Sequence, residues 1–398
     1  MEKVSALKTI KDKFQDILQF TDDDKLLFDL VPSVILATMH ENMMSPIWMY
    51  IIGPPGSGKT ESISPYSVLP NAVFVSTMTE NTLASGYRDD KNKEDPSLLL
   101  KLNKKVLVVK DISCLINDNK DKVTKIWGDL RDAYDGCFSK SSGTQGLVEY
   151  VAHFGCIMCA TGSIDTFNES HQQLGERFLA FRLHRRILSV REASKYAHRI
   201  FDSIKHKAAW RKALETVTYD QMVNAYDWLK KNPGLPDVAT KYENEICDLS
   251  AVVAILRTSP VGFKAEQPEL PSRLMLQLTG LGQAHALIDG RTEWNDEDTT
   301  LIKRVAFDTF PIDKRRLLQV LYRRGKNRPF SNLRYLTTSS KMDETNVHKT
   351  LMQWDYLKAV EPDKNEEGKV VGYKLSKEMY DILDEIKFFT GDHMPPSK

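Results

Sequence analysis

The feature that most constrains this chain is a glycine-rich motif that directly follows a short apolar segment. Residues 53–60 read GPPGSGKT, and residues 47–52 (IWMYII) have the composition of a strand buried on both faces. Glycines free the backbone of such a loop to turn its N–H groups inward around a phosphate. A helix that begins behind the loop then points its positive end at the same group. The sequence therefore predicts a phosphate-binding loop at the carboxyl end of a buried strand.

The residues of this loop have separate chemical roles. Lys59 supplies a cation for the β- and γ-phosphate oxygens, and the hydroxyl of Thr60 suits Mg²⁺. We therefore expect ATP and Mg²⁺ as cofactors. The residues expected to hold the nucleotide are Gly53, Gly56, Ser57, Gly58, Lys59 and Thr60. Pro65 follows closely and should shorten or kink the helix.

Further apolar segments continue the same pattern. Residues 71–76, 106–109, 154–160 and 178–183 are short and apolar, as expected for strands covered on both faces. Segments of helical character separate them. The expected fold class is therefore α/β, with a doubly wound parallel sheet.

An acidic residue follows the segment at 106–109, where a P-loop ATPase carries an Asp–Glu pair. One acid of that pair serves the water shell of the metal, and the other polarises the attacking water. Here the two residues are Lys110 and Asp111. If Asp111 has the metal role, Ile112 stands at the catalytic position; if Asp111 has the catalytic role, Lys110 replaces the metal-side acid. Because Mg²⁺ needs one or two protein ligands, either version can bind ATP. We expect Asp111 to be the main carboxylate and leave its role open.

The composition is typical of a globular protein, with 41% hydrophobic and 27% charged residues. No apolar run approaches the ~20 residues that a bilayer span requires, and residues 1–16 lack the core of a signal peptide. The five cysteines do not form a disulfide framework, since Cys156 and Cys159 are the sole close pair. We expect a cytoplasmic protein with no membrane contact.

The charge is balanced overall, with a formal net charge of +1, but it is unevenly distributed. Residues 314–349 contain ten Lys or Arg against two acidic residues, and residues 185–212 contain nine against two. Local basic faces of this kind suit nucleic acid. The alternative is that these stretches are solvated helix surface.

Three further residues carry a resemblance to AAA+ ATPases, in particular to the branch that contains MCM-type helicases. Thr161 in CATGS resembles sensor 1, which orients the attacking water. Arg177 in LGERF resembles the arginine finger, which reaches into the site of the neighbouring subunit. Residues 271–305 resemble the lid helices of MCM proteins, and Arg273 falls on the sensor 2 arginine. The resemblance implies that Asp111, Thr161, Arg177 and Arg273 are the catalytic residues.

Two candidate hairpins extend this resemblance. Residues 84–102 lie where MCM-type proteins insert a hairpin into the second helix, and residues 137–154 lie where they place a second hairpin before sensor 1. Gly143 and Gly146 mark a turn in the second one. In ring helicases such hairpins line the pore and contact DNA. The candidate contacts are Arg88, Lys91, Lys93 and Lys140. Residues 131–140 (RDAYDGCFSK) also resemble ATPases of phages and mobile elements.

The C-terminal segment is similar to a winged helix. We expect a helix capped by Asp313 and ended by Gly325, a second capped by Ser331, and a third capped by Asp343, followed by a hairpin. Residues 344–357 should bury a stripe at helical spacing. If the domain binds duplex DNA, the third helix enters the major groove. The candidate DNA contacts are Arg323, Arg324, Lys326, Arg328, Thr345, Asn346, His348 and Lys349.

A chain of 398 residues is too long for one ordinary core. The expected domains are an N-terminal helical arm (1–25), an AAA+ α/β core (26–185), a helical lid with an insertion (186–306), a winged-helix domain (307–390) and a tail (391–398). The resemblance implies a homo-oligomer, with a hexameric ring as the expected assembly, that hydrolyses ATP between subunits to translocate on or remodel DNA. Replication or transposition proteins are the expected partners. The alternatives are a slow ATP switch that recruits a partner helicase or transposase, and a regulator or defence protein in which ATP gates assembly.

Overall fold

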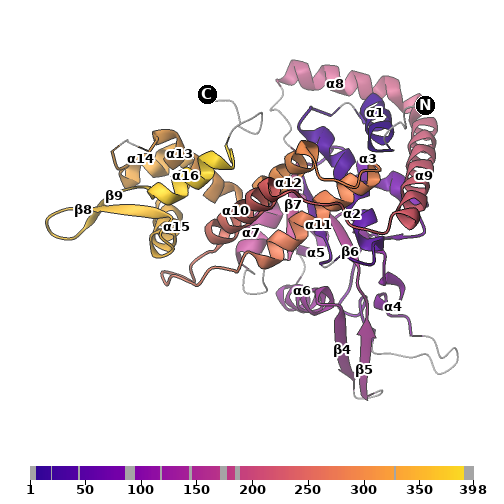
Figure 1. Cartoon of the computed structure of the whole chain (residues 1–398), viewed down its shortest axis with the longest axis horizontal. Coiled ribbons are helices and arrows are strands. Elements are labelled where there is room, and N and C mark those ends of the chain that lie inside the picture. The colour runs from indigo at the N-terminus through magenta and orange to yellow at the C-terminus, as the bar shows by residue number, and fades with distance from the viewer. Residues whose placement is uncertain are drawn as a thin grey trace. The chain divides into compact units, whose positions relative to one another are not determined.

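The computed structural model describes residues 6–18, 20–43, 45–85, 95–116, 119–142, 146–170, 177–183, 189–326 and 329–389 (Figure 1). The chain divides into two compact units. The first comprises residues 1–237 and 280–301, and the second comprises residues 238–279 and 302–398. In the described residues, no helix has both the length and the apolar character needed to cross a membrane.

The first unit is built on a five-stranded parallel sheet. Its strands are β1 (Trp48–Ile52), β2 (Ala72–Val75), β3 (Val106–Val109), β6 (Gly155–Ala160) and β7 (Phe178–Arg182). Their order in the sheet is β2-β3-β6-β1-β7, and every neighbouring pair is parallel. Each strand lies within one or two residues of the range expected from its apolar composition. The predicted α/β class with a parallel sheet is confirmed.

Helices flank this sheet. Those described in the first unit include α1 (Ala6–Leu18), α2 (Leu27–Met39), α3 (Lys59–Ile63), α4 (Leu99–Leu102), α5 (Ser113–Ile116), α6 (Lys120–Tyr134), α7 (Ser163–Ser170), α8 (Val190–Ser203) and α9 (Lys207–Lys231), with short 3-10 turns η1 (Asp24–Leu26), η2 (Ser64–Val68) and η4 (Ile204–His206). Trp48 and Tyr50 of β1 belong to one apolar cluster with residues of α6 and α7. Because side chains alternate along a strand, the intervening residues of β1 face the other way.

Helix α2 approaches the sheet closely at β3 and β6. A Cβ atom on Gly155 would lie 2.2 Å from Oγ1 of Thr38, so the first position of β6 has no room for a side chain. Helix α3, which begins within the GPPGSGKT motif at Lys59, ends at Ile63. The chain then continues as the 3-10 turn η2, which contains Pro65. The predicted shortening of this helix is confirmed.

A two-stranded antiparallel sheet projects from the first unit (Figure 1). It pairs β4 (Cys137–Ser142) with β5 (Gly146–Val151), with Phe138 opposite Tyr150. The two strands of this expected hairpin are therefore present, and residues 143–145 between them lie outside the described residues. The central residues of the other expected hairpin, 86–94, lie outside the described residues, and α4 occupies its last part.

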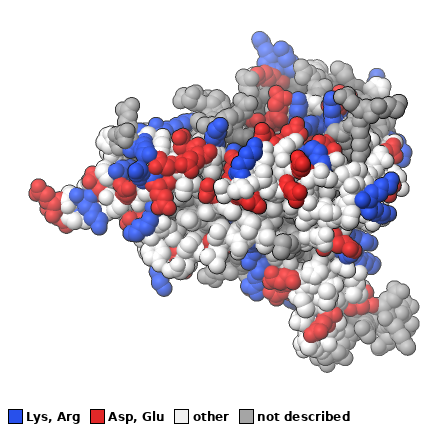
Figure 2. Space-filling view, in the orientation of Figure 1, with Lys and Arg blue, Asp and Glu red and all other residues white. Residues whose placement is uncertain are grey.

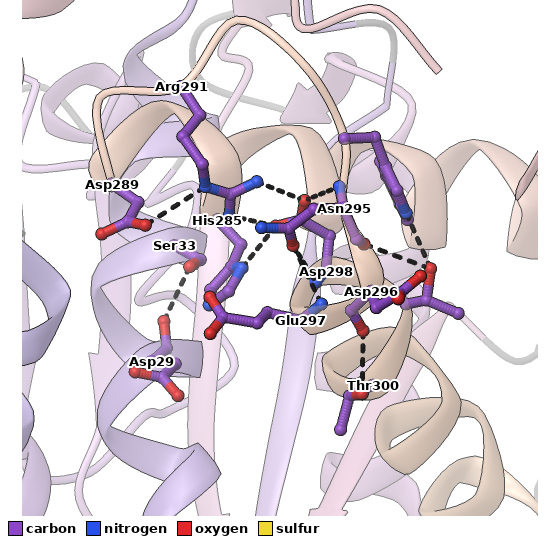
Figure 3. A network of polar contacts seen from close by, with 12 residues as sticks. Asp29, Ser33, His285, Asp289, Arg291, Asn295, Asp296, Glu297, Asp298 and Thr300 are labelled. Carbon is purple, nitrogen blue, oxygen red and sulfur yellow. Dashed lines mark hydrogen bonds and ion pairs between the residues drawn. The ribbon is translucent and has the colours of Figure 1, made fainter. Parts of the chain in front are cut away.

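A buried polar network joins α11 to α12 within the segment 280–301, and Asp29 and Ser33 of α2 lie beside it (Figure 3). His285 of α11 (Ser272–Ile288) lies with Nδ1 2.5 Å from Oδ1 of Asp298 in α12 (Asp296–Thr309). Arg291, in the connection between these helices, donates to both oxygens of the same carboxylate over 2.7 Å each. Asn295 accepts from the N–H groups of two residues in the first turn of α12 and so caps this helix.

The second unit contains α10 (Thr240–Arg257), α13 (Ile312–Arg324), α14 (Leu333–Ser340), α15 (Glu344–Tyr356), β8 (Val360–Lys364), β9 (Val370–Leu375) and α16 (Lys377–Glu385). Strands β8 and β9 form an antiparallel hairpin after three helices, which is the order expected from the sequence. Gly325 ends α13 with a φ of 82°, and Oδ1 of Asp343 accepts from the N–H of Asn346 at the start of α15.

Two of the expected caps are wrong. Pro311, rather than Asp313, precedes α13 as its cap residue. Asn332, rather than Ser331, caps α14, because its Oδ1 accepts from the N–H of Tyr335 over 2.8 Å. Ser331 instead pairs with Tyr373 of β9 as an isolated antiparallel bridge, which ties the start of α14 to the hairpin.

Candidate nucleotide-binding site

The loop after β1 has the backbone shape that its glycines predict. Gly56 has a φ of 73° and Gly58 a φ of 90°, in the left-handed region where a side chain would strain the backbone. A Cβ atom on Gly53 would lie 2.8 Å from Oγ of the buried Ser57. Three positions of the loop therefore require glycine, and the loop leads directly into α3 at Lys59.

Lys59 folds back over this loop. Its Nζ donates to the carbonyl oxygen of Gly53 over 2.6 Å and to that of Pro54 over 3.1 Å. Burial lowers the pKa of the Lys59 ammonium, and the nearby carboxylate of Asp111 opposes this shift. A cation that has lost part of its hydration is favourably placed for an anionic ligand, because the ligand's charge replaces the lost solvation.

The strand ends around the loop are joined by backbone hydrogen bonds. The N–H of Gly53 donates to the carbonyl oxygen of Ala160 at the end of β6 over 3.1 Å. The N–H of Ile112, after β3, donates to the carbonyl oxygen of Cys159 over 3.0 Å. Thr161 directly follows β6 and so lies between the start of the loop and the acidic segment after β3. This is the carboxyl edge of a parallel sheet, where ligands bind in open α/β folds.

Asp111 is exposed at this edge and has a structural partner. Its Oδ1 accepts from the N–H of Ser113 over 2.8 Å, at the start of α5. Lys110 points its ammonium toward the ring of Phe74, 5.6 Å from the ring centre. Thr161 in turn lies with Oγ1 2.8 Å from Oγ of Ser163, in the first turn of α7. Asp111 and Thr161 each contact the start of a helix, and both lie at the edge that carries the phosphate loop.

An ion pair that the sequence did not predict lies at the same edge. Arg182, the last residue of β7, donates to both oxygens of Asp165 in α7, over 2.8 and 2.6 Å. The Arg182 side chain is 9% exposed. Ile52, the last residue before the loop, pairs with Arg182 in the register of β1 and β7. The one feature of the sequence that could have indicated this ion pair is Arg182, a charged residue at the end of an otherwise apolar strand.

A second unpredicted contact involves Glu61, which directly follows Thr60. Arg211 of α9 donates to both of its carboxylate oxygens, over 3.2 and 2.7 Å, and Nζ of Lys207 lies 3.2 Å from Oε1. Burial by itself raises the pKa of Glu61, but these two cations outweigh it and lower the pKa. Two cations of the basic stretch at 185–212 therefore face the helix that begins at the phosphate loop.

The structure places Arg177 at the opposite edge of the sheet. Phe178 pairs with Trp48 at the amino ends of β7 and β1, and Arg177 directly precedes Phe178. Its side chain is 12% exposed, with Nη2 3.6 Å from Oδ2 of Asp135 and its guanidinium 5.6 Å from the centre of the Tyr134 ring. Arg177 is thus separated from its own phosphate loop by the length of a strand.

The remaining sequence candidates are spread over the chain. Arg273 belongs to the second unit, where Nη1 donates to Oε1 of Glu269 over 3.2 Å. Lys140 of β4 directs Nζ to the carbonyl oxygen of Ala84 and, over 3.1 Å, to Oδ1 of Asn81. The DNA candidates outside the described residues are Arg88, Lys91, Lys93 and Arg328.

The C-terminal candidates differ in exposure and in their contacts. Arg323, Thr345 and His348 are exposed. Nε of Arg324 donates to Oγ of Ser331 over 3.1 Å, and Lys326 pairs with Asp381. The ammonium of Lys349 lies 4.9 Å from the centre of the Phe263 ring. On the face shown in Figure 2, residues of both charge signs are interspersed.

The sequence has no match among protein-family models or curated proteins. Its chemistry therefore has to be argued from the site itself. Within the ranges that the structure describes, no group of three or more His, Cys, Asp or Glu residues could hold a metal ion by itself. A metal at the phosphate loop would need oxygens from a ligand in addition to Thr60 and Asp111, which suits Mg²⁺ bound with a nucleotide.

The loop fits a phosphate chain. Gly56 and Gly58 hold the backbone in a conformation that turns N–H groups inward, and Lys59 is a half-buried cation beside them. The nucleotide residues predicted from the sequence, 53 and 56–60, thus lie together in one loop. Of the four catalytic candidates, Asp111 and Thr161 lie at the same edge of the sheet, whereas Arg177 lies at the other edge.

Proposed function

We propose that this chain is an AAA+ ATPase that works as an oligomer and uses ATP, bound between subunits, to translocate on DNA or to remodel it. The observation that carries this proposal is the phosphate loop at the carboxyl end of β1, with Thr161 of the adjacent strand beside it. A parallel sheet flanked by helices agrees with such a core. Replication of a phage or mobile element is the setting that the sequence resemblance favours.

In this proposal each group near the loop has one task. The N–H groups between Gly56 and Gly58 and the ammonium of Lys59 bind the β- and γ-phosphates. Thr60 and Asp111 hold Mg²⁺, which neutralises charge on the phosphate oxygens when it is bound. Thr161, between the loop and the Asp111 segment, orients the attacking water.

Arg177 acts in this proposal on the nucleotide of a neighbouring subunit. Its place at the amino edge of the sheet separates it from the loop of its own chain, so any contact with a γ-phosphate requires a second copy. To reach that copy, the guanidinium has to leave Asp135 and the Tyr134 ring. Arg273 is proposed as the corresponding lid residue.

DNA contact is assigned in this proposal to two parts of the chain. The β4–β5 hairpin projects from the first unit, as expected for an element that lines a pore (Figure 1). In the second unit, α13, α14 and α15 followed by the β8–β9 hairpin have the element order of a winged helix. Movement of these elements with nucleotide state would be the basis of translocation or remodelling.

ATP binding by purified protein tests the first step of this proposal. Lys59→Ala should weaken binding of a fluorescent ATP analogue about 10- to 100-fold, because a charge-assisted hydrogen bond is lost. Lys120→Ala, which removes an exposed lysine at the start of α6, is the matched control and should bind normally. Equal binding by Lys59→Ala and the unchanged protein would refute the assignment of the loop.

A second candidate function is a slow ATP switch that recruits a partner helicase or transposase. It is favoured by Lys110, which stands where a second acid is expected, and by the capping contact that engages Asp111. Turnover should then stay low with single-stranded or duplex DNA although ATP binds tightly. Turnover that rises on addition of DNA would support the motor instead.

A further inference from the structure

A segment of the second unit lies along α15, the helix expected to enter a DNA groove. We call residues 261–267, between α10 and α11, the strap. It begins with a tight turn in which Val261 and Lys264 exchange two backbone hydrogen bonds of 3.0 Å, and Gly262 has a φ of 64°. Figure 1 shows this connection extending beside α15.

Hydrogen bonds and contacts of the Phe263 ring fasten the strap to α15, and the centre of this ring lies 6.2 Å from that of His348. The N–H of Glu266 donates to Oε1 of Gln353 over 2.9 Å, and Nε2 of Gln353 donates to the carbonyl oxygen of Glu266 over 2.7 Å. Nε2 of Gln267 donates to the hydroxyl of Tyr356 over 2.7 Å. At the turn, the ammonium of Lys349 lies 4.9 Å from the centre of the Phe263 ring.

These contacts lie on the side of α15 that faces away from its core. The buried stripe of the helix is Val347, Leu351 and Trp354, all with no exposed surface. The strap contacts Lys349, Gln353 and Tyr356, which are offset from that stripe by two residues and therefore by about 200° around the helix. Gln353 is also fully buried, so the strap covers the C-terminal half of this face, whereas Thr345, Asn346 and His348 in the N-terminal half stay exposed.

A covered helix does not fit the major groove. A helix with its side chains is about 10–12 Å wide, and the groove is about 12 Å wide. An extended chain beside the helix adds roughly 5 Å, taking the spacing of neighbouring strands as a guide. Where the strap lies on it, between Lys349 and Tyr356, α15 is too wide to lie along the groove, so duplex could approach its first turn alone.

The surface that remains has the groups that bind unpaired bases. The Phe263 ring is 62% exposed at the tip of the turn, and Tyr356 at the other end of the strap is 48% exposed. Lys264 and His348 are exposed beside them. Of the carboxylates nearby, Glu269 is paired with Arg257 and with Arg273. Glu266 of the strap and Glu344 and Asp355 of α15 also contribute negative charge to this part of the unit.

We propose that α15 and the strap together form a binding surface for single-stranded nucleic acid. An unpaired base stacks on the exposed face of Phe263, and Lys264, His348 and Lys349 face the phosphates. Stacking on an aromatic ring accepts any base, because every base has a π-face, and cations alongside follow the backbone. The inference deepens the proposed action on DNA and rests on it. It assigns single-stranded nucleic acid, not duplex, as the ligand of this surface of the second unit.

The test is the fluorescence anisotropy of a labelled single-stranded oligonucleotide and of the matching duplex, with the full chain. The unchanged protein should bind the single strand more tightly. Phe263→Ala should weaken that binding about 5- to 100-fold, and Lys264→Ala should weaken it and flatten its dependence on salt. Tyr219→Ala, which removes a ring of similar exposure from α9, is the control and should have no effect.

Loosening the strap separates the inference from its main rival. Gln353→Ala removes both hydrogen bonds to Glu266, and it should weaken single-strand binding. If it instead creates tight duplex binding, the strap is a cover over a groove-reading helix and the inference is wrong. Tighter binding of duplex by the unchanged protein, or no effect of Phe263→Ala, would also overturn it. Binding of neither form would count against the action on DNA itself, whereas ATP binding, measured in the same samples, reports on the phosphate loop.

Discussion

Asp111 and Arg177 each have a partner within the chain that competes with the chemical role proposed for them. The carboxylate of Asp111 accepts a backbone N–H at the start of α5, and the guanidinium of Arg177 packs on Tyr134 beside Asp135. Loss of activity in an alanine variant would therefore not distinguish a catalytic role from a structural contact. Substitutions that remove one of these two roles and keep the other can distinguish them.

Asp111→Asn and Asp111→Ala should have different consequences. The asparagine keeps an oxygen that accepts from Ser113, so the unfolding free energy should change by less than about 0.5 kcal/mol, whereas alanine should cost about 1 kcal/mol. Both variants lose the negative charge, so both should lose Mg²⁺-dependent ATP turnover. Chemical denaturation and a phosphate-release assay measure the two effects. Normal turnover by Asp111→Asn would show that the carboxylate is a cap and nothing more.

Arg177→Ala and Asp135→Ala form a second matched pair. Each removes one side of a contact at 3.6 Å, in which the Asp135 side chain is 63% exposed, so each should lower the unfolding free energy by about 1 kcal/mol or less. Arg177→Ala alone should abolish turnover, since it alone removes the proposed finger. If the two variants have equal turnover, Arg177 is a structural residue.

At the scale of elements, a polar network connects α11 to α12 within the segment 280–301. The fully buried carboxylate of Asp298 is held by His285 and Arg291 (Figure 3). Burial by itself raises the pKa of Asp298, but these hydrogen bonds and charges outweigh burial and hold it below 3.8. A lowered carboxyl pKa stabilises the fold above the unfolded-state pKa of about 3.9, and that contribution is lost as the pH falls through the folded value.

Asp298→Asn should therefore destabilise the protein in a pH-dependent manner. At pH 7 we expect a loss of about 3 kcal/mol, because Arg291 is left without its buried counter-charge. Below about pH 4 the difference from the unchanged protein should begin to shrink, because the carboxyl group of the unfolded chain takes up a proton there, and it should be lost once the pH falls through the lowered folded pKa. Urea denaturation at a series of pH values measures this. A difference that is constant from pH 7 to pH 3 would mean that the charge of Asp298 does not matter.

At the scale of the whole molecule, the two ends of the central sheet predict how subunits cooperate. The phosphate loop lies at the carboxyl edge and Arg177 at the amino edge, so one chain does not bring both to one nucleotide. If Arg177 is the finger that we propose, a complete site needs two copies, and activity is then a property of the assembly.

Mixing two inactive variants tests this shared site. Lys59→Ala and Arg177→Ala should each lack turnover when alone. In a mixture, some neighbouring pairs combine an intact loop from one chain with an intact Arg177 from the other, so part of the activity should return. Steady-state turnover at varied mixing ratios measures this. A mixture that stays inactive, although sedimentation shows mixed oligomers, would contradict a site shared in this way.

Local sequence determined much of the fold. The phosphate loop, the five strands and the cap at Asp343 were predictable, because each depends on residues within one short segment: glycine where φ is positive, apolar residues where both faces are covered, and an acceptor at a helix start. Two caps were misplaced by one or two residues. At α14 two adjacent polar side chains, Ser331 and Asn332, could each serve as the cap, whereas α13 begins after Pro311 with no side-chain cap.

The tertiary structure alone decided which side chains meet. The order of the strands places Thr161 beside the phosphate loop and Arg177 at the far edge, although both flank strands of the same sheet. The strap on α15 joins residues that are almost ninety positions apart, such as Glu266 and Gln353 (87 apart). No local pattern encodes such a contact, because it depends on the path of the whole chain. The sequence thus determined which chemical groups are available at each position, and the packing of the chain decided which of these groups lie next to one another.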